Sequence, residues 1–382
     1  MSALAKRAPR AVRLPIAVLV LSAALLATSA TAAMALPAKF WGASYQATPT
    51  SERMQRLKQG GVESVRVPIG WSSVQPTRGG SAQWLAVDIQ IERAVQQGLD
   101  VLPFVYGAPS WAVPSDYVPG SHKTVKAPRE LPVFGRARGA WMEFMRMVVN
   151  RYGPRGSFWS EHPELPKRPL RIWQIWNEPN FKYFVTRPNP AQYGKLVKYS
   201  YKAVKSVDPG ARILLAGLFA RPKEAQWKVK PPQAYFATDF IDQMYRRTPG
   251  IGSKFIGVSL HPYTRRFQLL NPYIREMREV LKRNRNAGKG LWITEIGWSS
   301  QKPTSSNLFA KGLGGQKRQL QGAFRLLHKN YKNWRIKRVY WFSVEDARGS
   351  CNFCDGSGLF TEEFTPKPAW YAYVRFAGGR AG

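Results

Sequence analysis

Two glutamates, each placed after a short apolar stretch, form the pattern in this sequence best suited to chemistry. Glu178 lies in residues 175–180 (IWNEPN), and Glu295 lies in residues 291–298 (LWITEIGW). Aromatic and β-branched residues before each glutamate are typical of buried parallel strands, so each carboxyl group is expected where a strand meets its loop. A single glutamate at such a position is commonly a solvated strand end. Two of them can supply an acid and a nucleophile.

This pair of carboxyl groups matches the needs of glycosidic bond hydrolysis. One group must protonate the departing oxygen, and the other must attack the anomeric carbon or activate water. Glu178, as the acid, has to keep its proton near neutral pH, which calls for partial burial and proximity to the charge of Glu295. A retaining mechanism predicts carboxyl groups roughly 5 to 5.5 Å apart, whereas inversion needs a wider gap.

The elements that must position these groups are predicted from the alternation of strand-like and helical patterns. Because barrels carry their chemistry at the carboxyl ends of the strands, the fourth and seventh strands would bring both glutamates to one mouth. We therefore predict a single (β/α)₈ TIM barrel over residues 36–382. A doubly wound open sheet is the alternative, but no glycine-rich dinucleotide motif follows the first strand. The predicted strands are 40–45, 64–69, 101–106, 170–176, 212–218, 255–261, 291–296 and 339–343, and the clearest helices are 140–152, 191–207, 271–286 and 316–331.

Two long irregular stretches, residues 107–139 and 221–233, are rich in proline and basic residues. In a barrel both would follow strands at the mouth, where long loops commonly bind ligands. Several basic residues are predicted in such loops, and they indicate positive charge around the mouth. They are Lys182, Arg187, Arg221, Lys223, Lys228, Lys230, Arg265, Arg266 and Arg348.

The first 35 residues have the composition of a secretory signal peptide. Four basic residues precede or flank an apolar run over residues 14–26, and Ala33-Met34-Ala35 fits an A-x-A cleavage site. We therefore expect a secreted or cell-envelope protein. An uncleaved membrane anchor is the alternative, and it is the one case in which a membrane would be a partner.

The chain is strongly basic, with 58 Lys and Arg against 23 Asp and Glu. Without the four basic residues of the signal segment, 54 remain against the same 23, a net charge of +31. Such a field favours acidic polysaccharides, envelope phosphopolymers, lipid surfaces or, nonspecifically, nucleic acid. A general effect on solubility is the plainer interpretation. No recognisable nucleic-acid motif is present, so no specific nucleic-acid partner is expected.

The two cysteines, Cys351 and Cys354, form a C-x-x-C pair near the carboxyl end. In an exported protein they are expected to form a structural disulfide. Free thiols and a redox pair are the alternatives, although no thioredoxin-like βαβ pattern surrounds them. A zinc site would need more ligands than the sequence offers nearby.

The sequence resembles the clan A retaining glycoside hydrolases, in particular the cellulase-like family 5 and the xylosidase-like family 39. The resemblance spans nearly the whole chain after residue 35. It is carried by the Asn-Glu-Pro after the fourth strand and the glutamate after the seventh, together with residues 65–67 (VRV), 261–263 (HPY) and 340–342 (YWF). It implies that Glu178 is the acid/base and Glu295 the nucleophile.

Other matching positions have roles that their chemistry makes reasonable. Asn177 would hydrogen-bond the sugar 2-hydroxyl group. Tyr263 would hold Glu295 and keep its pKa low enough for attack, and Arg66 would add positive charge at the same place. His261 and Trp341 would line the sugar site. The structural alternatives are a buried ion pair for Arg66, a satisfied polar group for His261 and barrel core for Trp341.

Four tryptophans, Trp71, Trp111, Trp298 and Trp341, follow or end predicted strands. An aromatic face can bury the apolar side of a sugar ring. Because most of the 14 tryptophans must serve ordinary packing, only Trp298 and Trp341 are predicted to contact sugar. A histidine that cellulase-like relatives often carry after the third strand is replaced here by residues around Tyr106 and Trp111, which leaves sugar specificity open.

The expected function is therefore an exported retaining glycoside hydrolase acting on a carbohydrate, with an acidic glycan among the possible substrates. No motif calls for a metal or an organic cofactor. A noncatalytic glycan-binding or envelope-attachment protein on a hydrolase-like barrel is the main alternative. A basic protein that binds polyanions by charge is another. A transglycosylase would use the same covalent intermediate.

Overall fold

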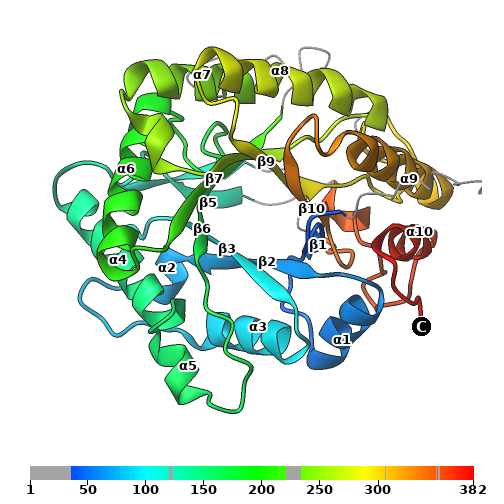
Figure 1. Ribbon diagram of the computed structural model, residues 1–382, viewed down its shortest axis with the longest axis horizontal. Helices are drawn as coiled ribbons and strands as arrows, with labels where there is room; N and C mark the ends of the chain where they lie inside the picture. The colour runs from blue at the N-terminus through cyan, green and yellow to red at the C-terminus, as the bar shows by residue number, and fades with distance from the viewer. Residues whose placement is uncertain (1–35, 120–123, 221–233, 306, 350, 352) are drawn as a thin grey trace, which may run out of the picture. The chain divides into compact units, whose positions relative to one another are not determined.

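Eight parallel strands close into a barrel in the order β1-β10-β9-β8-β7-β6-β3-β2. The structure is a computed structural model that describes residues 36–119, 124–220, 234–305, 307–349, 351 and 353–382. The strands form a central ring with helices around it (Figure 1), and the predicted (β/α)₈ barrel is confirmed. The barrel strands are β1 (Trp41–Ser44), β2 (Ser64–Gly70), β3 (Asp100–Tyr106), β6 (Ile172–Asn177), β7 (Arg212–Phe219), β8 (Gly257–His261), β9 (Gly290–Ile296) and β10 (Ile336–Phe342).

The four predicted helices correspond to α4, α6, α8 and α9, with ends shifted by a few residues. Helix α6 shows why its ends fall where they do. The Asn189 side chain caps its start by accepting from the backbone N–H groups of Ala191 and Gln192, and the helix stops before Pro209. The helices are α1 (Ser51–Gln59), α2 (Trp71–Val74), α3 (Leu85–Gln96), α4 (Gly135–Tyr152), α5 (Ser157–Glu161), α6 (Pro190–Val207), α7 (Ala237–Arg247), α8 (Leu270–Arg283), α9 (Gly312–Asn330) and α10 (Pro368–Ala377), with 3₁₀ turns η1 (Ile251–Lys254), η2 (Phe267–Leu269) and η3 (Cys354–Gly356).

The stretch between β3 and α4 is only partly irregular. It contains a two-stranded antiparallel hairpin, β4 (Ser115–Pro119) with β5 (Thr124–Pro128), which the sequence analysis did not predict. The second long stretch, residues 221–233, lies outside the described residues, as does the predicted signal segment. Among the described residues, no helix has the length and apolar character that crossing a membrane requires.

The barrel interior is layered along the strand direction. Leu102, Leu214, Trp292 and Tyr340 come from four strands and pack together as an apolar cluster. Because side chains alternate along a strand, the next inward position on β9 is Thr294, which is fully buried and polar. A polar layer therefore lies on the carboxyl-end side of the apolar one, and it supports the groups at the mouth.

Candidate active site

Glu178 and Glu295 come together at the carboxyl ends of β6 and β9. Both are largely buried, with 6% and 8% of their surface exposed. One oxygen of each carboxyl group lies within 4.8 Å of the other. This spacing fits the roughly 5 to 5.5 Å of a retaining pair and falls short of the roughly 6.5 to 9.5 Å that an inverting pair needs.

Two donors hold Glu295. The Tyr263 hydroxyl donates to its Oε2 at 2.6 Å, and the Arg66 guanidinium donates from Nη1 to its Oε1 at 2.6 Å. Burial raises the pKa of Glu295, while the Arg66 charge and both hydrogen bonds pull that pKa back down. Burial also raises the pKa of Tyr263 well above its ordinary value, so the phenol stays protonated and remains a donor.

Arg66 uses all three of its nitrogens in fixed contacts. Besides Glu295, its Nε donates to Gln174 Oε1 at 2.8 Å and its Nη2 donates to Asn177 Oδ1 at 2.7 Å. Its guanidinium carbon lies 3.7 Å from the ring centroid of Phe104. Since the oxygen of Asn177 faces Arg66, the amide NH₂ group points away from the guanidinium. Arg66 thus orients the side chains of Glu295, Asn177 and Gln174.

His261 lies between the two glutamates. Its Nδ1 is 2.7 Å from Glu178 Oε1 and 3.3 Å from Glu295 Oε2. Burial, together with the charge of Arg66, lowers the pKa of His261 well below its ordinary value, so the ring is neutral near pH 7. A neutral imidazole carries one proton, and its position depends on the partner of the other nitrogen.

That partner is the Thr294 hydroxyl, which lies 3.0 Å from Nε2 of His261. Gln174 Nε2 donates to the same hydroxyl at 3.3 Å, and Arg66 fixes the orientation of Gln174. The hydroxyl oxygen therefore accepts from Gln174 and gives its own proton to Nε2 of His261. We assign the ring proton to Nδ1, facing the carboxyl groups. The sequence analysis missed Gln174 and Thr294, because one polar residue within an apolar strand gives no distinctive signal.

The backbone that carries Glu178 is strained. Trp176 and Glu178 have φ angles of 71° and 40°, in the left-handed region that side-chain-bearing residues rarely adopt. Such residues each cost about 1–3 kcal/mol and cluster at functional sites. The Glu178 N–H donates to Gly217 O at 2.9 Å, and Trp176 Nε1 donates to Phe184 O at 3.1 Å. These bonds hold the end of β6 so that Glu178 meets His261.

The structure corrects the prediction that Trp298 and Trp341 contact sugar, because neither ring has any exposed surface. Trp341 follows the inward-facing Tyr340, so strand alternation turns it outward, where it lies 6.3 Å from the Phe324 ring of α9. Trp298 lies 6.2 Å from Trp341 and donates to the carbonyl of Thr264. Both rings belong to the core between the barrel and its helices.

Phenylalanines, and not the two predicted tryptophans, provide the aromatic rings beside Tyr263. Phe342, Phe353 and Phe309 are all partly exposed, and their ring centroids lie 6.2, 4.9 and 6.2 Å from that of Tyr263. They form an apolar wall beside Tyr263, which donates to Glu295, and such a wall is suited to the apolar face of a sugar. Phe342 is the neighbour of Trp341 that points inward, since Tyr340 belongs to the interior cluster and side chains alternate along β10.

The predicted disulfide between Cys351 and Cys354 is confirmed, with an S–S distance of 2.03 Å. Its loop contains Phe353, whose ring stacks on Phe342 at 5.9 Å between centroids. The Ala347 N–H also donates to the Cys354 carbonyl. The disulfide therefore fixes a loop that forms part of the apolar wall beside Tyr263.

Glu178, His261 and Glu295 could each offer one atom to a metal ion, since these atoms lie within 4.8 Å of one another. However, Arg66 already places a positive charge 2.6 Å from Glu295, and Tyr263 donates to its second oxygen. A divalent cation would have to displace both contacts. The set of donors therefore fits a hydrogen-bonded pair of carboxyl groups better than a metal centre.

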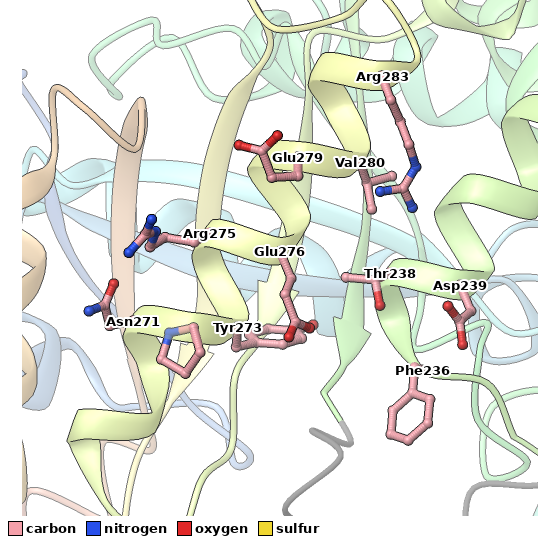
Figure 2. A pocket seen from close by; sticks show the side chains of 11 residues that line it. Phe236, Thr238, Asp239, Asn271, Tyr273, Arg275, Glu276, Glu279, Val280 and Arg283 are labelled. Carbon is pink, nitrogen blue, oxygen red and sulfur yellow. The ribbon is translucent and has the colours of Figure 1, made fainter.

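A cavity of about 590 Å³ lies on the outer side of the barrel, between α7 and α8 (Figure 2). Its lining mixes both signs of charge, with Asp239, Glu276 and Glu279 beside Arg275 and Arg283. None of the residues around Glu178 and Glu295 lines it. It is separate from the candidate active site.

No protein-family model matches the chain, and no curated protein matches its sequence. Solved structures do match. A family 39 glycoside hydrolase from Bacteroides cellulosilyticus is 19% identical with a TM-score of 0.62, over 89% of this chain and 64% of that one. A monomeric β-xylosidase from Caulobacter crescentus is 18% identical with a TM-score of 0.59, over 89% and 68% of the two chains.

A family 5 glycoside hydrolase from Bifidobacterium longum, solved with Manβ1-4GlcNAc, is 12% identical with a TM-score of 0.58, over 89% of this chain and 78% of that one. These structural neighbours are clan A barrels, as the sequence resemblance implied. At such identities the likeness establishes the fold. The activity and substrate of this chain have to be argued from its own residues.

Proposed function

We propose that this protein is a retaining glycoside hydrolase in which Glu178 is the acid/base and Glu295 the nucleophile. The observation that carries the proposal is a close pair of carboxyl groups in different surroundings. Their oxygens lie within 4.8 Å, yet Arg66 and Tyr263 donate to Glu295, while His261 lies nearest to Glu178. Such a difference in environment is what divides acid and nucleophile roles between two like residues.

In the first step, Glu178 gives its proton to the glycosidic oxygen while a carboxylate oxygen of Glu295 attacks the anomeric carbon. The bond to the leaving sugar breaks as a covalent glycosyl ester forms. In the second step, Glu178 takes a proton from water as the water oxygen attacks the same carbon and releases Glu295. Two inversions at one carbon retain its configuration.

The supporting residues act on this sequence at defined atoms. Tyr263 and Arg66 hold the two oxygens of Glu295 and favour its ionised form. The Asn177 amide, oriented by Arg66, donates to the sugar 2-hydroxyl, a hydrogen bond that strengthens as positive charge develops on the ring. Phe342 and Phe353 receive the apolar face of the sugar.

We propose that residues 1–35 direct export to the cell envelope or the medium, and that the partner met there is a carbohydrate. The Cys351–Cys354 disulfide supports this, because structural disulfides persist mainly in oxidising compartments outside the cytosol. Glycosidase-like structural neighbours support a carbohydrate partner.

The test is release of reducing ends from a panel of neutral and acidic polysaccharides. Glu178→Gln is expected to lower the rate roughly 10²- to 10⁴-fold, and Glu295→Gln at least as much. Glu276→Gln makes the same chemical change on the exposed outer face of α8 and should leave the rate unchanged. Products longer than the substrate would identify transglycosylation by the same residues.

Circular dichroism on each variant keeps loss of activity distinct from loss of fold. Release that survives in Glu295→Gln would overturn the proposed mechanism. Binding of a glycan with no release by the folded wild-type protein would favour the noncatalytic glycan-binding barrel.

A further inference from the structure

The basic residues predicted at the mouth fall into distinct groups in the structure. Arg187 lies 3.9 Å from Glu130, and Arg348 lies 3.1 Å from Glu362, so each has a carboxylate nearby. Arg265 and Arg266 have no ion pair within the part of the chain that the structure describes. These two arginines follow Tyr263 by two and three residues, so they leave β8 at the same end of the barrel as the nucleophile.

Both arginines line a cavity of about 430 Å³, within the roughly 300–1,000 Å³ typical of ligand pockets. Its walls are the segment after β8 and the segment between β9 and α9. Lys311 adds a third positive charge, and Gln319 adds an amide. No carboxylate is among the lining residues that the structure describes, in contrast to the mixed charges of the cavity between α7 and α8.

The backbone around the arginines is anchored before any ligand binds. The Arg266 carbonyl accepts from the Thr264 hydroxyl at 3.0 Å and from the Leu269 N–H at 3.1 Å. The Thr264 carbonyl in turn accepts from the buried Trp298 Nε1 at 2.7 Å. Trp298 therefore has a structural role here: it fixes the loop that carries the charges.

The donors in the cavity are also held in place. Gln319 Oε1 accepts from the Phe267 N–H at 2.7 Å, so the NH₂ group of Gln319 points away from that N–H. Lys311 Nζ donates one hydrogen to the Leu308 carbonyl at 2.7 Å. Burial and the nearby charge of Arg265 lower the pKa of Lys311, so like charges face each other here without a counter-charge among the lining residues. An anion in the cavity would relieve that repulsion.

The cavity is connected to the candidate active site through Phe309. The Phe309 ring lies 6.2 Å from the Tyr263 ring, while the residues on either side of it, Leu308 and Ala310, line the cavity. A glycan whose cleaved bond lies beside Glu295 would therefore meet the cavity with a neighbouring sugar unit.

We propose that this cavity is a subsite for an anionic substituent, a carboxylate or a sulfate or phosphate ester, on a sugar next to the cleaved bond. The protein's substrate is then an acidic glycan. This inference rests on the proposed hydrolase function for its meaning, but binding to the cavity can be measured without turnover. Arginine suits the role because its planar fork can donate two parallel hydrogen bonds to one oxyanion.

The test measures binding by titration calorimetry in the Glu295→Gln background, so that no substrate is consumed. The probes are an oligogalacturonate, the same oligomer with its carboxyl groups reduced to alcohols, and a sulfated galactan oligomer with its neutral parent. We compare two double variants: Arg265→Gln/Arg266→Gln, called the arginine pair, and Lys282→Gln/Lys329→Gln, called the control pair. The control pair also removes two charges, but from the last turns of α8 and α9, at the opposite end of the barrel.

The arginine pair is expected to weaken binding of at least one acidic oligomer about tenfold or more, and to leave its neutral counterpart unchanged. The control pair should bind like the parent. Which acidic oligomer responds tells a carboxylate subsite from a sulfate or phosphate one. The slope of affinity against salt concentration should also fall in the arginine pair alone.

Equal weakening by both pairs, equal loss for the neutral oligomers, or no binding of any acidic oligomer by the parent would overturn the proposal. So would tight binding of a single-stranded oligodeoxynucleotide that is lost in the same variant, which would make the cavity a general polyanion site. If selective acidic binding holds while the wild-type protein cleaves nothing, the subsite stands and the hydrolase function fails. If the wild-type protein cleaves a glycan and the Arg265→Gln/Arg266→Gln variant cleaves it equally well, the hydrolase function stands and the subsite fails.

Discussion

Tyr263 contributes, after burial and the charge of Arg66, to the pKa of Glu295, and it also holds that carboxyl group in position. Its hydroxyl donates to Glu295 Oε2 at 2.6 Å, and that hydrogen bond favours the ionised carboxylate, lowering its pKa against the effect of burial. In the proposed mechanism, Glu295 attacks the anomeric carbon in its ionised form. The acid side of the pH–activity profile should therefore reflect how well Glu295 is held.

We predict that Tyr263→Phe raises the pKa of Glu295 and moves the acid limb of kcat/KM to higher pH. The sign follows because the lost donor had favoured the ionised carboxylate. Tyr273→Phe is the matched control, since the Tyr273 hydroxyl is buried without a partner among the described residues. A Tyr263→Phe profile that keeps the wild-type acid limb, with only its height reduced, would contradict this role.

In the proposed mechanism, Thr294 and Gln174 act through His261 as positioning residues. The Thr294 hydroxyl accepts from Gln174 and faces Nε2 of His261 at 3.0 Å, which directs the ring proton toward Glu178. Replacing that hydroxyl with a methyl group removes the partner of two buried nitrogens.

We predict that Thr294→Val lowers kcat/KM roughly tenfold to a hundredfold, because the ring loses its fixed tautomer and position. The decisive measurement is the ¹⁵N NMR signal of His261, which should change from a single Nδ1–H tautomer to a mixture. Assignment is simple because the chain has only four histidines. Thr294→Ser keeps the hydroxyl and should restore both readouts. An unchanged tautomer in Thr294→Val would remove the positioning role.

Gly217 leaves the space that the His261 side chain occupies. It lies on β7, and a Cβ atom there would come 1.8 Å from Nε2 of His261. The absence of a side chain at position 217 of β7 thus makes room for the imidazole of His261 on β8. Gly139, within α4, differs in that a Cβ atom would meet nothing within 4 Å.

We predict that Gly217→Ala displaces His261 and lowers kcat/KM roughly a hundredfold, with the free energy of unfolding reduced by about 1–3 kcal/mol. Gly139→Ala should instead raise the free energy of unfolding by about 0.5–1 kcal/mol, because alanine favours a helix interior, and leave activity unchanged. Denaturant unfolding and initial rates measure both. Full activity in Gly217→Ala would mean that His261 can move without cost.

Sequence patterns predicted the buried barrel strands well and the short, partly exposed strands poorly. Strands such as β9 are buried at every position, so their apolar runs were readily recognised. The β4–β5 hairpin was missed because its strands are short, partly exposed and contain lysine and proline. Trp341 was assigned to the wrong face because residues 339–342 (VYWF) are all apolar, so the sequence of this part of β10 gives no contrast between its two sides. Which residues of β10 face inward depends on tertiary packing.

The residues of the site were predicted unevenly for a related reason. Glu178, Glu295, Arg66, Asn177, His261 and Tyr263 stand in motifs, and the structure brings all six together. Gln174 and Thr294 stand in no motif. Their importance comes from contacts between strands far apart in the sequence.

At the scale of the whole molecule, the unequal distribution of ion pairs matters more than the total charge. Most of the excess of Lys and Arg is spread over the chain, and several exposed arginines have carboxylate partners, as Arg283 has in Asp242. Arg265, Arg266 and Lys311 have no ion pair among the described residues, and the proposed subsite would give this part of the charge a specific role.

We predict that expression of the full chain in a bacterial host with a general secretion pathway yields a processed protein beginning at Leu36. The basic start, the apolar run and Ala33-Met34-Ala35 are the features that a signal peptidase reads. N-terminal sequencing and intact mass of the exported protein test this. Ala35→Arg should block cleavage. An intact Met1 on an exported, membrane-bound protein would instead favour the uncleaved anchor.

The central claim, that Glu295 forms a covalent bond to the sugar, has a direct test. The protein is incubated with a panel of 2-deoxy-2-fluoro glycosides bearing good leaving groups, and the inactivated species is digested and sequenced by mass spectrometry. We predict one added glycosyl unit on Glu295, and none in Glu295→Gln. A protein that turns over these or natural glycosides while Glu295 stays unmodified, and that releases products of inverted configuration, would contradict the mechanism.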